Sequence, residues 1–298
     1  MLIYKNYDQE ALDGQYNNRL NVPDFATYLD RWEVLSRETE EKFTCIKDLQ
    51  YGELPRERLD VYPSSFPNAT TLVFIHGGYW HMFDKASFQF IAKAFQPYGI
   101  TTILISYPLA PANTIDQLVS SCRKAIVWLH QNLSTFNGNP EAIFVAGHSA
   151  GGHLAAMLLH THWAEFGRDL PVDLVKGTVA ISGIFNLTPI RLSYLNKVLN
   201  IDAEVAIRNS PVFIDTVKSS PLILAVGKEE SPEFIDQSSE LYRQRKTMGS
   251  PVHFIQMPGQ NHYSIIETIL DQNSALSLAM REMMGIKINI IEDFFKRT

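Results

Sequence analysis

The chain has 298 residues, of which 45% are hydrophobic and 19% charged, and its formal net charge is −6. This composition is typical of a globular protein and excludes a disordered or fibrous one. The 26 basic and 32 acidic residues form no long block of one sign, which argues against nucleic-acid binding. No apolar run reaches the roughly 18 residues of a membrane span, and no signal-peptide pattern opens the chain. The sequence therefore indicates a cytoplasmic protein that does not enter membranes.

The length fits one domain around a single core, residues 1–298, with a small inserted cap. Residues 1–44 are a polar, aromatic-rich lead-in, with a helix expected over Pro23–Phe43. The two cysteines, Cys45 and Cys122, are far apart and share no motif. We expect them to be reduced thiols, with neither a disulfide nor a metal site.

Eight short strand-like runs follow, and several are apolar throughout, as strands buried on both faces of a sheet are. They cover residues 45–52, 58–63, 71–78, 101–108, 142–149, 177–183, 221–228 and 252–259. Stretches long enough for helices lie at 84–98, 114–136, 150–163, 232–248 and 262–284. This alternation predicts an α/β fold with a mostly parallel sheet between two layers of helices. The first two runs could form an antiparallel hairpin at one edge.

One segment, residues 183–220, interrupts the alternation of strands and helices. It contains a helix-like stretch at 188–201, and we expect about residues 184–220 to form a small cap over the strand ends. The tail at 287–298 could be a short helix or a strand. An exposed edge strand or the cap surface could support a homodimer.

A G-x-S-x-G motif, Gly147 to Gly151, follows an apolar strand and opens a helix-like stretch. In this context the motif is typical of the nucleophile elbow of α/β hydrolases, because small residues allow the sharp strand-to-helix turn that exposes the serine. Ser149 would also lie at a helix N-terminus, where free N–H groups favour negative charge. A serine in this place can also be a simple helix cap. The combined context favours Ser149 as a nucleophile.

The run FIHGGYW ends an earlier strand and is typical of loops that donate backbone N–H groups to an oxyanion. We assign the donors to Gly78, Tyr79 and Ala150. His76 is expected at the substrate pocket, where it would anchor this loop by hydrogen bonding, and Tyr79 and Trp80 are interpreted as walls of that pocket. An ordinary glycine turn followed by core aromatic residues is the alternative.

The base and the acid should follow the serine in the chain, in the order serine, acid, histidine. His262 lies in a loop after the last strand and is the predicted base, whereas His253 alternates with apolar residues inside that strand. The acid should come from the loop after residues 221–227, where Glu230 is preferred and Glu229 is next. Glu233 and Asp236 also compete, but acidic residues are common in the first turn of a helix for dipole reasons.

The motifs HGGYW, GHSAGGHLA and YPLAP resemble the hormone-sensitive-lipase-like branch of the α/β hydrolases. YNNRLNVPD, SGIFNLTPI and GKEESPEF resemble kynurenine formamidase (arylformamidase)-like proteins, and the likeness runs from about Tyr16 to beyond His262. It implies an α/β-hydrolase fold with Ser149 as nucleophile, His262 as base, Glu230 as acid and the HGGYW backbone as oxyanion hole. Family members often carry aspartate at the acid position, so the longer glutamate must fold back to reach His262.

The resemblance implies a serine hydrolase that cleaves an aryl formamide, similar to N-formylkynurenine, or a small acyl ester through an acyl-enzyme. The substrate is a small molecule, and no metal or organic cofactor is implied. A broad short-chain carboxylesterase is the alternative, and a non-catalytic binding protein with the same fold is a remote one. If the substrate is an amino acid derivative, a basic side chain would meet its carboxylate, with Arg191 preferred over Lys197 and Arg123.

Overall fold

The structure is a computed structural model that describes residues 1–214 and 220–286; the tail element expected at 287–298 lies outside them. The strands are β1 (Ile46–Gln50), β2 (Arg58–Tyr62), β3 (Ala69–Ile75), β4 (Thr101–Ile105), β5 (Gly138–His148), β6 (Val175–Ile181), β7 (Leu222–Gly227) and β8 (Val252–Met257). The α-helices are α1 (Gln9–Gln15), α2 (Asn18–Asn21), α3 (Phe25–Lys42), α4 (Phe90–Phe95), α5 (Ile115–Asn132), α6 (Ala150–Leu159), α7 (Thr188–Leu192), α8 (Asn196–Leu199), α9 (Ala203–Arg208), α10 (Pro232–Thr247), α11 (Ser264–Glu267) and α12 (Ala275–Met283). The 3-10 turns are η1 (Lys85–Phe88), η2 (Gln96–Tyr98), η3 (Leu133–Phe136), η4 (Trp163–Glu165), η5 (Pro211–Phe213) and η6 (Thr268–Leu270).

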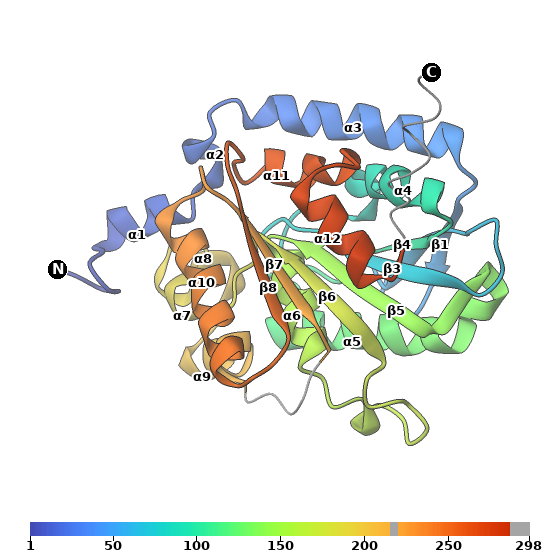
Figure 1. The fold of residues 1–298 in the computed structure, drawn as a ribbon. Helices are drawn as coiled ribbons and strands as arrows, with labels where there is room; N and C mark the ends of the chain where they lie inside the picture. The colour runs from blue at the N-terminus through green and yellow to red at the C-terminus, as the bar shows by residue number, and fades with distance from the viewer. Residues whose placement is uncertain (215–219, 287–298) are drawn as a thin grey trace.

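The eight strands form one sheet in the order β1-β2-β4-β3-β5-β6-β7-β8 (Figure 1). The pairs β1·β2 and β2·β4 are antiparallel, and every pair from β4·β3 to β7·β8 is parallel. The prediction of a mostly parallel sheet with an antiparallel hairpin at one edge is confirmed. Because parallel strands end at the same edge of the sheet, the loops after β3, β5, β6, β7 and β8 converge there.

The sheet is covered by helices on both faces (Figure 1). Along β3, Val73 and Ile75 belong to a buried apolar cluster with residues of α5 and α6. Leu72 and Phe74 belong to a second cluster, with residues of α3, α4 and α12. Successive side chains of a strand point to opposite faces, so a continuously apolar strand supplies both cores.

Two predicted helical stretches are divided in the structure. The stretch at 262–284 consists of α11, η6 and α12, because the chain is extended at Asp271 and Ser274 caps the new helix by accepting a hydrogen bond from the Ser277 N–H at 3.0 Å. The stretch at 188–201 contains α7 and α8, which are separated where Ser193 adopts an extended conformation. The Ser193 hydroxyl donates to the Ile190 carbonyl at 2.9 Å and accepts from the Leu195 N–H at 3.3 Å, so at both places a serine side chain bonds to nearby backbone in competition with helix continuation.

The N-terminal lead-in and the segment after β6 pack on each other. Asp13 at the end of α1 accepts a hydrogen bond from the Tyr194 N–H at 2.7 Å, and the Gln9 side-chain amide donates to the Leu192 carbonyl at 3.0 Å. The helix expected over Pro23–Phe43 is confirmed as α3. Within residues 1–214 and 220–286, no helix is long and apolar enough to cross a membrane.

Candidate active site

Ser149 lies between β5 and α6, in a backbone conformation that non-glycine residues rarely adopt, with φ 58° and ψ −121°. The turn is tight because glycines flank the serine. A Cβ added at Gly147 would lie 2.1 Å from the Gly151 carbonyl oxygen, and one added at Gly151 would lie 2.0 Å from the Ile75 carbonyl oxygen. The elbow therefore fits only with glycine at both positions, and its strain is of the kind found at functional sites.

The structure brings Ser149, His262 and Glu230 together although they come from three separate loops. The Ser149 Oγ lies 3.0 Å from His262 Nε2, and His262 Nδ1 lies 2.7 Å from Glu230 Oε2. All three residues are buried. With the Nδ1 proton donated to the carboxylate, Nε2 is the nitrogen that can accept the serine proton, which is the arrangement that general-base activation of a hydroxyl requires.

Glu230 folds back toward the end of its own strand. Its Oε1 accepts hydrogen bonds from the Gly227 N–H at 2.8 Å and from the Ser182 hydroxyl at 2.5 Å, which leaves Oε2 for His262. Glu229 is exposed and makes no contact with the imidazole in the described structure. The geometry thus favours Glu230 over Glu229 as the partner of His262.

Ser182 was not among the site residues predicted from the sequence. It directly follows β6, the strand next to β5, and has a positive φ of 49°. A serine at the carboxyl end of the strand beside the one that ends before Ser149 was the available signal. Together with the Gly227 amide, it determines which carboxylate oxygen faces His262.

His148 anchors the loop that carries His262. The His148 Nε2–H donates to the backbone carbonyl of His262 at 2.8 Å, and its ring meets Trp32 of α3 edge-on at 6.3 Å. Burial lowers the pKa of His148 well below its usual range, so this ring is neutral at pH 7. His148 therefore positions the loop and does not compete for the serine proton.

The loop after β3 lies against the serine. A Cβ added at Gly77 would be 3.1 Å from Ser149 Cβ, so the glycine permits this contact. The amide N–H groups of Gly78, Tyr79 and Ala150 make no hydrogen bond within the part of the chain that the structure describes. Free amides beside a nucleophile can stabilise an oxyanion, each by about 3 kcal/mol.

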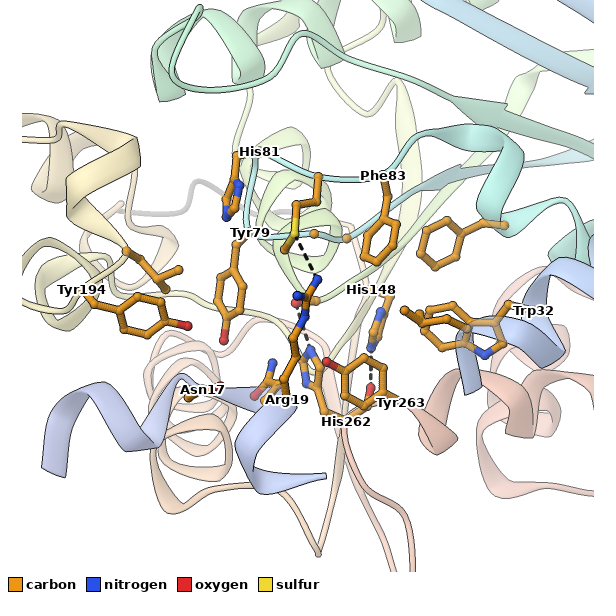
Figure 2. Close-up of a pocket in the computed structure, with 18 residues that line it drawn as sticks. Asn17, Arg19, Trp32, Tyr79, His81, Phe83, His148, Tyr194, His262 and Tyr263 are labelled. Atoms are coloured by element: carbon orange, nitrogen blue, oxygen red, sulfur yellow. Dashed lines mark hydrogen bonds between the residues drawn. The ribbon is translucent and has the colours of Figure 1, made fainter. Parts of the chain in front are cut away.

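Ser149 and His262 face a cavity of about 290 Å³, shown in Figure 2. Its walls come from the start of α2, from α3, from the loops after β3 and β8 and from the segment around Tyr194. They include Asn17, Arg19, Trp32, Tyr79, Phe83 and Tyr263. The N-terminal residues were not predicted from the sequence to line a pocket. Their polar, irregular sequence carries no periodic signal of a pocket wall.

Three residues expected at the substrate pocket do not line this cavity. Trp80 is fully buried and its indole N–H donates to His153 Nδ1 at 3.1 Å, so it is a core aromatic residue and Tyr79 forms the wall. His76 is also fully buried, with Nδ1 2.8 Å from the Gly77 carbonyl and its ring stacked on Tyr107 at 4.3 Å, as expected of a loop anchor. Arg191 lies in the last turn of α7 and is not among the residues that line the cavity.

The sheet order and the elbow at the end of β5 define the class of protein, an α/β hydrolase. The BD-FAE family model matches residues 59–244. The chain is 36% identical over 247 residues to kynurenine formamidase of Danio rerio, covering 80% of this chain and 82% of that protein. It is 34% identical over 249 residues to kynurenine formamidase of Salmo salar, covering 80% of this chain and 81% of that protein.

Among solved structures, a candidate thioesterase from Silicibacter sp. TM1040 superposes with a TM-score of 0.79 at 27% identity, covering 90% of this chain and 97% of that one. The chain belongs to the BD-FAE family of α/β hydrolases and, within that fold, to the kynurenine formamidase-like proteins. The fold class, the family resemblance and the conclusion that the chain is a hydrolytic enzyme are confirmed.

Proposed function

We propose that Ser149, His262 and Glu230 are a catalytic triad that hydrolyses an aryl formamide or a small acyl ester. The Ser149 Oγ attacks the carbonyl carbon while His262 Nε2 takes the hydroxyl proton. The amides of Gly78, Tyr79 and Ala150 stabilise the oxyanion. His262 then returns the proton to the leaving nitrogen or oxygen, the acyl-enzyme forms, and water repeats both steps to release the acid.

The hydrogen-bonded series from Ser149 to His262 to Glu230, with distances of 3.0 and 2.7 Å, is the observation that carries this proposal. Within the described residues the amides of Gly78 and Tyr79, in the loop after β3, and of Ala150, the first residue of α6, are free of hydrogen bonds. Backbone strain at Ser149 and its alignment with an imidazole and a carboxylate are expected of a catalytic site and are not needed for binding alone. This argues against a non-catalytic binding protein.

The substrate class is supported by the relatives named kynurenine formamidase. The cavity of about 290 Å³ is at the small end of ligand sites, and its aromatic walls suit an aryl group. A broad short-chain carboxylesterase is the second candidate. It is favoured by the apolar side chains of Leu29, Phe83 and Phe88 in the same cavity, which would accept a short acyl chain.

The first prediction is that Ser149→Ala lowers kcat by about 10⁵-fold on every substrate, because the acyl-enzyme can no longer form. Wild type and variant should be compared on aryl formamides, including N-formylkynurenine, and on p-nitrophenyl esters of increasing chain length. A formamidase cleaves N-formylkynurenine with a higher kcat/KM than butyryl esters; a carboxylesterase shows the reverse order. A Ser149→Ala protein with full activity on all substrates would overturn the proposal and revive the binding-protein alternative.

The domain division and the location of the protein stay predictions. We propose one domain over residues 1–298, with about residues 184–220 as a small cap, and the support is that Tyr194 and Leu195 line the cavity. A cytoplasmic location and a homodimer are also retained as predictions. Sedimentation of the purified protein tests the dimer.

A further inference from the structure

The cavity beside Ser149 has a charge that the proposed chemistry does not use. Among the described residues that line it, Arg19 is the sole arginine or lysine, and none is an aspartate or glutamate. Two of its histidines, His81 and His148, have pKa values lowered by burial and are neutral at pH 7. Arg19 therefore supplies a permanent positive charge to the site.

The guanidinium of Arg19 has no carboxylate partner within residues 1–214 and 220–286. Its contacts are the Phe25 ring, 5.2 Å from the guanidinium carbon, and the Met82 sulfur, 3.6 Å from Nη2. Figure 2 shows the side chain extending over the cavity to this sulfur. By contrast, Arg31 on α3 is paired with Glu267 at 2.9 Å. The contacts of Arg19 orient its charge and do not neutralise it.

The backbone that carries Arg19 is fixed to the site. The Tyr16 carbonyl accepts hydrogen bonds from the Tyr79 hydroxyl at 2.6 Å and from the Tyr194 hydroxyl at 3.2 Å. Asn17 caps the turn of α2 by accepting from the Leu20 N–H at 3.1 Å. Since Tyr79 belongs to the loop with the free amides, Arg19 is tied to the part of the site where the substrate carbonyl would lie.

From these contacts we infer that Arg19 is a specificity residue that binds a carboxylate on the amine or alcohol part of the substrate. The inference rests on the proposed function and narrows it to anionic acyl donors. An arginine can donate two parallel hydrogen bonds to a carboxylate, and a neutral substrate gains nothing from it. Arg19 takes the role that the sequence had suggested for Arg191.

The test compares anionic and neutral substrates of the same shape. One pair is N-formylkynurenine and its carboxamide, and a second is 3-acetoxybenzoate and 3-acetoxybenzamide. We expect wild type to prefer the anionic member. In Arg19→Gln, kcat/KM for the anionic member should fall about tenfold further than for the neutral one, mainly through KM. Arg19→Lys should retain part of the preference, because it keeps the charge and loses the paired geometry.

Arg37→Gln is the matched control, since Arg37 is an exposed arginine on α3 that lines a neighbouring groove and not this cavity. The preference should persist in this variant. Raised ionic strength should reduce the wild-type preference, because the exposed charge of Arg19 is screened. Equal effects of Arg19→Gln on both members of a pair would overturn the inference, and so would a loss of the preference in Arg37→Gln as large as the loss in Arg19→Gln.

The same measurements distinguish a failure of the role inferred for Arg19 from a failure of the proposed hydrolase function. A wild-type protein that cleaves both members of a pair equally well contradicts the role of Arg19 and leaves the hydrolase proposal intact. A protein that cleaves no member of either pair and none of the p-nitrophenyl esters contradicts both.

Discussion

At the scale of single residues, the site depends on how one carboxylate is oriented. Glu230 has one methylene more than an aspartate, and the surplus length is taken up by turning Oε1 back to the Gly227 amide and the Ser182 hydroxyl. Oε2 then faces His262 at 2.7 Å. Hydrogen bonds to an ionised group are about twice as strong as neutral ones, so this pair would favour the imidazolium that forms during the reaction.

We therefore expect Glu230→Gln to lower kcat/KM by about 10³-fold, because the amide cannot stabilise the imidazolium and can impose the wrong tautomer on His262. The measurement is the steady-state rate with p-nitrophenyl acetate. Glu229→Gln is the control, since Glu229 is exposed and should be replaceable without loss. Comparable losses of kcat/KM in the two variants would show that the Glu230 carboxylate has no specific role in catalysis.

At the scale of elements, the elbow is a contact between β3, β5 and α6. The first turn of α6 packs so closely on β3 that no side chain larger than the hydrogen of Gly151 fits beside the Ile75 carbonyl. The three elements must keep this distance for Ser149 to project over the sheet edge.

Gly151→Ala is expected to lower the free energy of unfolding by about 3 kcal/mol, because the added methyl meets backbone that cannot rotate away. Urea unfolding measures the change, and activity should fall with it. Gly14→Ala provides the contrast, since nothing lies within 4 Å of a Cβ added there in α1. That variant should be neutral or slightly more stable. An unchanged free energy of unfolding in Gly151→Ala would mean that the packing of α6 on β3 has room for a methyl group, and would contradict the close contact of Gly151 with the Ile75 carbonyl.

At the scale of the whole molecule, buried histidines make stability depend on pH. Burial lowers the pKa of His76 and His153 from 6.5 to about 4, and both rings are fully enclosed. Below about pH 6.5 these histidines bind protons in the unfolded chain, whereas in the folded protein they stay neutral until the pH falls to about 4. The free energy of unfolding should thus decrease as the pH falls through this window, by up to about 3 kcal/mol per histidine.

Urea unfolding at pH 7, 6 and 5 tests this expectation. His153→Gln should give a smaller loss of unfolding free energy between pH 7 and pH 5 than wild type, because one buried histidine fewer takes up a proton on unfolding. Its stability at pH 7 will also be lower, since His153 accepts from Trp80 and donates to the Asn209 carbonyl. A wild-type free energy that stays constant from pH 7 to pH 5 would contradict the assignment of neutral buried rings.

The eight strands, the edge hairpin and the elbow were predictable from the sequence because each leaves a local pattern. Apolar runs such as residues 71–75 must be buried on both faces, and Gly147 and Gly151 flank the serine at fixed spacing. The order serine, acid, histidine also restricted the candidates to a few residues. These are properties of short segments, which one sequence can reveal.

Other features depended on which segments come together in space. Trp80 was expected in the pocket wall and lies in the core, while Arg19, 130 residues before Ser149 in the chain, lines the cavity. Only the tertiary structure decided that Ser182 would face Glu230. Local sequence determines backbone conformation and burial, but a side chain meets a partner from a distant loop only through the packing of the whole sheet and its helices.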